Sequence, residues 1–288
     1  MAAPKLIKIN KNRYITALIG FIAIVLAIYF LFIFEKGAKE IKKDEPQGEV
    51  KQLAQVELKN RPYVTLTPTT DGAEIIVSIE NMSFFDDIEY EMTYLADNPQ
   101  SPSEKIQRGA TGTGVNTKDE KYKTSVLLGT ASKGVRSPDR GVSDGKLTMH
   151  MFKGDVEYQS EHEWVLVEIG KTATTLKDSQ GNFELEVPPT LGKTYWAILA
   201  DTIGIPPSAD FDSTTVATPV YGTFSVAPKF SKPTSLTIKL SKDVQTPILH
   251  IYNSVDSKWA TKDVNYNSTD KTITTTVDNF ATFIPASK

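Results

Sequence analysis

Three histidines are the first residues to consider for catalysis or metal binding. They are His150, His162 and His250, and none stands in an H-E-x-x-H motif or at another spacing typical of a metal site. His162 lies between Glu161 and Glu163. On a strand, both carboxylates point to the face opposite the imidazole. The pattern therefore predicts a structural or solvent-facing role for the histidines.

Three aspartates in one stretch are the remaining candidates for a metal site. Asp201, Asp210 and Asp212 could hold a calcium ion, because carboxylate oxygens are the ligands that calcium prefers. The D-x-D-x-D-G pattern of an EF-hand loop is missing, however. We therefore predict no metal and no cofactor, and keep calcium at these aspartates as the weaker alternative.

Signatures of nucleophilic catalysis are absent from the sequence. The chain has no cysteine and no G-x-S-x-G motif, and the Gly-rich segment 109–114 lacks the GK[ST] of a phosphate-binding loop. Trp164, Trp196 and Trp259 could line a sugar platform, but all three lie on or beside apolar strands, which favours core packing. The sequence thus predicts no catalytic residues and no enzyme.

Period-two patterning dominates the chain from Pro62 onward. Ile75, Val77 and Ile79 share one face, and the same alternation recurs at 88–94, 122–128 and 147–151. Such alternation is typical of antiparallel strands with one buried face. About seven short strands predict an immunoglobulin-like β-sandwich over residues 61–168.

Two long segments of this first domain are rich in Gly, Ser and Lys. They cover residues 97–119 and 129–144. We predict them to be loops, and loops of that length are often where such folds bind their partners.

A second set of alternating segments predicts another β-sandwich, over residues 169–288. Its motifs are DSQGNFELEVPP (178–189), YGTFSVAPKFSKPTSLTIKL (221–240), LHIYNSVDSKW (249–259) and VDNFATF (277–283). In this order they resemble a ZU5-type β-sandwich, and GNFELEVP is also similar to carboxypeptidase-regulatory-like domains. The resemblance implies an interaction or scaffolding module. Together with the N-terminal segment, the whole chain looks like a single-pass bacterial envelope protein.

The element that must position both domains is an apolar run near the N-terminus. Ile15 to Phe34 holds twenty residues without a charge, the length that one helical membrane span needs. We predict a basic tail at 1–13, a transmembrane helix at 14–34 and a charged stalk at 35–60. The run is longer than a signal-peptide core and no A-x-A-like site follows, so the anchor is expected to stay uncleaved.

The flanks of the span bear on its orientation and its packing. Four basic residues and no acid precede it, which favours a cytoplasmic N-terminus and extracytoplasmic C-terminal domains at the plasma membrane. Within the span a stripe of small residues would allow close helix pairing, and hence a homodimer. The stripe is Thr16, Gly20, Ala23 and Ala27.

The net charge of the sequence argues against one class of partner. The chain beyond residue 34 has 28 basic and 35 acidic residues, a net charge of −7, which argues against nucleic acid. We expect an all-β protein with two antiparallel sandwiches behind one transmembrane helix. It would be a membrane-anchored extracytoplasmic binding or scaffolding protein whose partners are the lipid bilayer and another envelope or surface protein. The alternatives are a surface hydrolase or carbohydrate-binding protein, and a cytoplasm-facing tethered scaffold.

Overall fold

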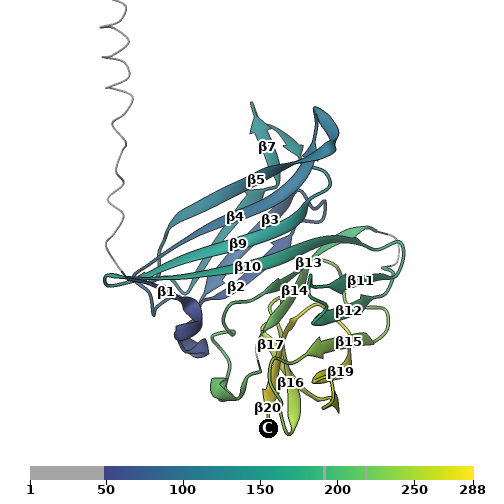
Figure 1. The fold of residues 1–288 in the computed structure, drawn as a ribbon. Coiled ribbons are helices and arrows are strands. Elements are labelled where there is room, and N and C mark those ends of the chain that lie inside the picture. Colours follow the sequence, from purple (N-terminus) through teal and green to yellow (C-terminus); the bar gives the residue numbers. More distant parts are fainter. Residues whose placement is uncertain (1–48, 191–192, 218) are drawn as a thin grey trace, which may run out of the picture. The chain divides into compact units, whose positions relative to one another are not determined.

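Strands make up most of the computed structural model, which describes residues 49–190, 193–217 and 219–288 (Figure 1). The first ten strands are β1 (Glu49–Gln52), β2 (Tyr63–Pro68), β3 (Glu74–Glu80), β4 (Asp87–Asn98), β5 (Ser101–Val115), β6 (Lys121–Leu127), β7 (Gly129–Ser132), β8 (Val135–Pro138), β9 (Ser143–Lys153) and β10 (Val156–Ile169). The others are β11 (Thr174–Lys177), β12 (Phe183–Val187), β13 (Tyr195–Asp201), β14 (Tyr221–Ser225), β15 (Thr234–Lys239), β16 (Pro247–Asn253), β17 (Lys258–Asp263), β18 (Asn265–Asn267), β19 (Thr272–Val277) and β20 (Thr282–Ser287). The all-β prediction is confirmed for these residues.

In residues 49–190, 193–217 and 219–288, the helices are three short 3-10 turns. They are η1 (Leu53–Gln55), η2 (Leu58–Asn60) and η3 (Ser213–Thr215). Within the described residues no helix has the length and hydrophobicity to cross a membrane. The predicted tail and anchor, with the stripe at Thr16, Gly20, Ala23 and Ala27, lie outside the described residues.

One ten-stranded sheet runs through both halves of the described chain. Its order is β17-β16-β20-β14-β13-β10-β9-β4-β5, with β1 added beside β10. A three-stranded sheet, β2-β3-β6, and a five-stranded sheet, β11-β12-β15-β19-β18, accompany it. The predicted boundary at residues 168 and 169 falls at the end of β10, which pairs with β13 across that boundary.

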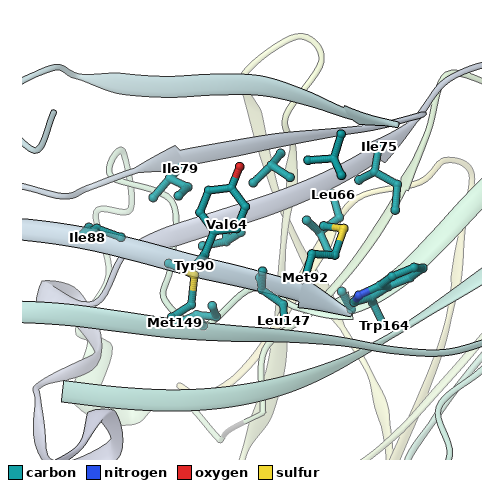
Figure 2. Packing of buried hydrophobic residues seen from close by; sticks show 14 of the residues in the cluster. Val64, Leu66, Ile75, Ile79, Ile88, Tyr90, Met92, Leu147, Met149 and Trp164 are labelled. Atoms are coloured by element: carbon teal, nitrogen blue, oxygen red, sulfur yellow. The ribbon is translucent and has the colours of Figure 1, made fainter. Parts of the chain in front are cut away.

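The first hydrophobic core lies between the ten-stranded sheet and the three-stranded sheet. Side chains from β2 and β3 point toward those of β4, β9 and β10 in Figure 2. The alternating residues predicted from the sequence supply this core: Ile75, Val77 and Ile79 are fully buried, as are Met149 and Met151. Burial of these apolar faces is the main stabilising term for the three strands of the smaller sheet.

The second core lies against the opposite face of the same sheet. Along β13, Ile198 and Ala200 belong to the first core, whereas Ala197 and Leu199 belong to the second. Successive residues of a strand point to opposite faces. The five-stranded sheet therefore packs on the side of β13 away from the first core.

The two segments predicted as long loops contain strands, so that prediction is wrong. Residues 101–115 form β5, which pairs along β4, and residues 129–138 form the β7–β8 hairpin. The inner face of β5 carries Ile106, Ala110 and Gly112, and a Cβ on Gly112 would lie 2.1 Å from the Tyr90 ring. Because the strand packs with so few large apolar side chains, its alternation is invisible in the sequence.

The C-terminal part of the predicted stalk is folded against the first core. Residues 49–60 form β1, η1 and η2, and Leu53 and Val56 belong to the first core. Arg61 fixes this segment by donating from Nε to the carbonyl of Val56 (2.8 Å) and from a terminal nitrogen to the carbonyl of Ala54 (3.0 Å).

Candidate functional site

An interruption in strand pairing marks the candidate site. β9 pairs with β10 from Val156 to Trp164. On the other side of β10, β1 pairs with residues 156–159 and β13 with residues 164–169. No described residue pairs with the four residues between them, Ser160 to Glu163, on that side. We call this stretch the open edge.

The open edge exists because β13 stops at a sharp turn. Asp201 Oδ1 accepts a hydrogen bond from the amide of Ile203 (2.7 Å), and the amide of Gly204 donates to the carbonyl of Thr202 (2.7 Å). Ile203 adopts a φ of 69°, a left-handed conformation that β-branched residues rarely adopt. A Cβ on Gly204 would lie 2.4 Å from the carbonyl oxygen of Arg61.

This turn is a strained feature held in place by its surroundings. A left-handed β-branched residue costs about 1–3 kcal/mol and persists only where neighbouring contacts impose it. Here the buried Ile203 side chain and the tight approach of Gly204 to Arg61 supply those contacts. Strain of this kind clusters at functional sites, so the turn supports the assignment of a site beside it.

His162 and Asp201 meet at the open edge. The imidazole Nδ1 of His162 lies 3.2 Å from Asp201 Oδ2, and its side chain is only 16% exposed. Nε2 is buried without a hydrogen-bond partner among the described residues, and so is the hydroxyl of Ser160 on the same face of β10. Two side chains of the open edge thus carry buried polar atoms that no described residue satisfies.

Two pockets flank the open edge and share Glu161, His162, Asp201 and Pro219. The first, of about 230 Å³, also contains Leu53, Arg61 and Ser160; we call it the Arg61 pocket. The second, of about 470 Å³, also contains Glu163, Asp178, Ser179 and Tyr221; we call it the acidic pocket.

Carboxylates dominate the acidic pocket. Its described lining holds Glu161, Glu163, Asp178 and Asp201 but no lysine or arginine. Lys146 on β9 reaches this lining from outside, with its Nζ 2.8 Å from Glu161 Oε1. A negatively charged concave surface attracts cationic groups.

Arg61 is not among the described residues that line the acidic pocket. It lines the other pocket, and its guanidinium is directed to the backbone carbonyls of residues 54 and 56. Burial lowers the pKa of Arg61, and the charge of Asp201 acts in the opposite direction. Arg61 thus serves mainly to hold the segment that follows β1.

Two of the aspartates considered for calcium, Asp201 and Asp212, make hydrogen bonds with different residues. Asp201 binds His162 and Ile203, whereas Asp212 caps η3 by accepting from the amide of Thr214 (2.9 Å), a bond that lowers the pKa of Asp212. Among the residues that the structure describes, no three or more acidic or histidine side chains are grouped as a metal site would require.

The tryptophans and the other histidines line neither of the two pockets at the open edge. Trp164 is buried in the first core, and the ring of Trp196 covers Gly72. Trp259 donates to the hydroxyl of Ser208 (3.0 Å). His250 stacks on Phe211 with ring centroids 4.1 Å apart, and His150 Nδ1 lies 2.7 Å from Glu157 Oε1.

The pairing of His162 with Asp201 was not foreseen from the sequence. The two residues are 39 positions apart and belong to no motif. The useful signal was Asp201 followed by Thr-Ile-Gly at the end of an apolar strand, a sequence suited to a side-chain-capped turn. No serine hydroxyl among the described residues bonds the free nitrogen of His162, so the arrangement lacks the nucleophile–base contact of a catalytic triad.

No protein-family model and no curated protein sequence matches the chain.

Proposed function

We propose that this chain is a membrane-anchored binding or scaffolding protein. It would be held by residues 14–34, with its β domains on the extracytoplasmic side of the plasma membrane. The observation that carries the proposal is the open edge, where an interrupted strand, a strained turn and two pockets coincide. Binding sites are concave and combine a largely preformed shape with a few convergent polar groups.

The order of the segments supports this role. The charge-free run Ile15–Phe34 is long enough for an anchor, and the acid-free tail before it favours a cytoplasmic N-terminus. The two hydrophobic cores would belong to two sandwich units that share one sheet. The ZU5-type resemblance of residues 169–288 adds the expectation of a partner in the envelope.

The absence of cysteine allows a direct test of topology. Val255 is 85% exposed, so Val255→Cys provides a single labelling position in the described domain. Asn10→Cys provides the matched position in the basic tail. Intact cells expressing each variant are treated with a maleimide that cannot cross membranes. We expect Val255→Cys to react at once and Asn10→Cys to react only after permeabilisation.

The reverse labelling pattern would favour a cytoplasm-facing tethered scaffold. Recovery of both variants in the soluble fraction after cell lysis would remove the anchor from the proposal altogether.

A surface hydrolase is the second candidate, because four carboxylates line the acidic pocket. Glycoside hydrolysis needs two carboxylates placed on either side of the scissile bond. The full chain is incubated with a panel of oligosaccharides, and products are detected by mass spectrometry. Cleavage that disappears in Glu161→Gln or Glu163→Gln would favour this candidate, and no cleavage by the wild type would count against it.

A further inference from the structure

We propose that the open edge binds an extended peptide carrying lysine or arginine, which adds to β10 as a short strand between β1 and β13. This inference rests on the proposed binding function and names the class of its partner. It draws on the interrupted pairing of β10, on the neighbouring strand β1 and on the charge of the acidic pocket.

The backbone of the open edge has hydrogen-bonding groups that a further strand could use. In an antiparallel pair, alternate residues direct their N–H and C=O groups away from the partner strand. Along Ser160–Glu163 no described strand pairs with those outward groups, and these four residues line the two pockets. A peptide in extended conformation satisfies such groups by strand addition, the mode in which main-chain hydrogen bonds provide affinity.

β1 demonstrates that this side of β10 accepts an added strand. Its four residues, Glu49 to Gln52, pair in parallel with residues 156–159, directly next to the open edge. The chain then turns away into η1. Beside Ser160–Glu163 no described strand follows, because β13 ends at the turn that Asp201 holds.

The carboxylates of the acidic pocket favour a peptide with basic side chains. Glu161 and Glu163 lie on one face of the open edge, and Asp178 and Asp201 join them in the acidic pocket. Lys146 donates to one oxygen of Glu161 and Ser179 to one oxygen of Glu163, which leaves the second carboxylate oxygen of each glutamate as an acceptor for further donors. Basic side chains two residues apart on an added strand would lie on the face of these two glutamates.

The test uses the full chain in nanodiscs of zwitterionic phosphatidylcholine, which do not attract basic peptides. A fluorescein-labelled Val-Lys-Val-Lys-Val peptide is titrated at about 0.15 M salt, and binding is followed by fluorescence anisotropy. Three control peptides are measured in parallel: one with glutamate in place of lysine, one N-methylated on the lysine amides and one N-methylated on the valine amides. N-methylation blocks strand pairing and retains the charge.

We expect the glutamate peptide, and at least one N-methylated peptide, to bind at least tenfold more weakly than the parent. The double variant Glu161→Gln/Glu163→Gln should also weaken binding of the parent peptide at least tenfold. Glu168→Gln changes an exposed glutamate of β10 outside the pocket lining and should leave binding unchanged.

Equal binding of both N-methylated peptides and the parent would overturn strand addition, and unchanged binding by the double variant would overturn the site. Absence of binding up to millimolar peptide would overturn the peptide proposal as well. The cysteine labelling described above would then still decide the anchored topology separately.

Discussion

Asp201 connects the fold and the candidate site at the level of a single residue. One carboxylate oxygen holds the turn that ends β13, and the other contacts His162. The turn leaves Ser160–Glu163 of β10 without a partner on one side, so the same side chain creates the open edge and lines both of its pockets.

Replacement of Asp201 can separate these contacts. Asp201→Asn retains an oxygen that can accept from the amide of Ile203, whereas Asp201→Ala leaves that amide without its partner. We expect the alanine variant to lose about 1–2 kcal/mol more of the free energy of unfolding than the asparagine variant. Urea unfolding of residues 49–288 measures the difference, and equal losses would contradict the role given to the turn.

His250 makes the stability of the domain depend on pH. Burial against Phe211 lowers the pKa of His250, and Asp210 raises it by a smaller amount. The unfolded chain therefore takes up a proton at higher pH than the folded chain, so stability falls as the pH falls through the range below about 6.5. We expect His250→Gln to lose less stability than the wild type between pH 7.5 and 5.5. Parallel losses in chemical denaturation would refute this contribution.

At the level of elements, one buried hydrogen bond links β2 to β20, the last strand of the chain. The hydroxyl of Tyr63 on β2 lies 2.7 Å from Oγ1 of Thr282 on β20, and both side chains are buried. The amide of Val64 also donates to the carbonyl of Thr202 (3.0 Å). These contacts dock the three-stranded sheet on the strands that carry the second core.

A double-mutant cycle tests this docking. Tyr63→Phe and Thr282→Val each leave a buried hydroxyl without its partner, so each should cost about 1–3 kcal/mol. The double variant should cost less than the sum, because both substitutions remove the same bond. Tyr266→Phe removes a solvent-exposed bond to Asp243 and serves as the control, with an expected change within about 0.5 kcal/mol. Additive losses would show that the two hydroxyls do not interact.

Elements with strong apolar alternation were predictable, and those without it were not. β3, β9, β12 and β15 could be predicted because large apolar side chains make up most of their buried faces. β5 was predicted as a loop because glycine and alanine occupy much of its buried face. Sheet order was also beyond the sequence, since β2 and β20 meet through residues 219 positions apart.

The candidate site was less predictable than the fold. His162 and Asp201 are far apart in sequence, and their approach depends on where β13 stops pairing. That end depends in turn on a left-handed isoleucine, a conformation that sequence propensities would not assign. The aspartates could be chosen as candidates by residue type, but their partners come from tertiary contacts.

For the whole described molecule, the shared sheet predicts cooperative unfolding. β13 contributes to both hydrophobic cores, so loss of one core exposes apolar surface of the other. We expect residues 49–288 to unfold in urea as one transition, with tryptophan fluorescence and far-ultraviolet circular dichroism coinciding. Two separated transitions would indicate that the two hydrophobic cores unfold independently.

For the open edge, the most direct test is amide-resolved hydrogen exchange of the full chain. In the free protein, we expect alternate amides within Ser160–Glu163 to exchange rapidly, while the amides of Trp164–Ile169 that pair with β13 remain protected. Addition of the Val-Lys-Val-Lys-Val peptide should then slow exchange within Ser160–Glu163. Protection of all four amides in the free protein, equal to that of the neighbouring segment, would contradict the account.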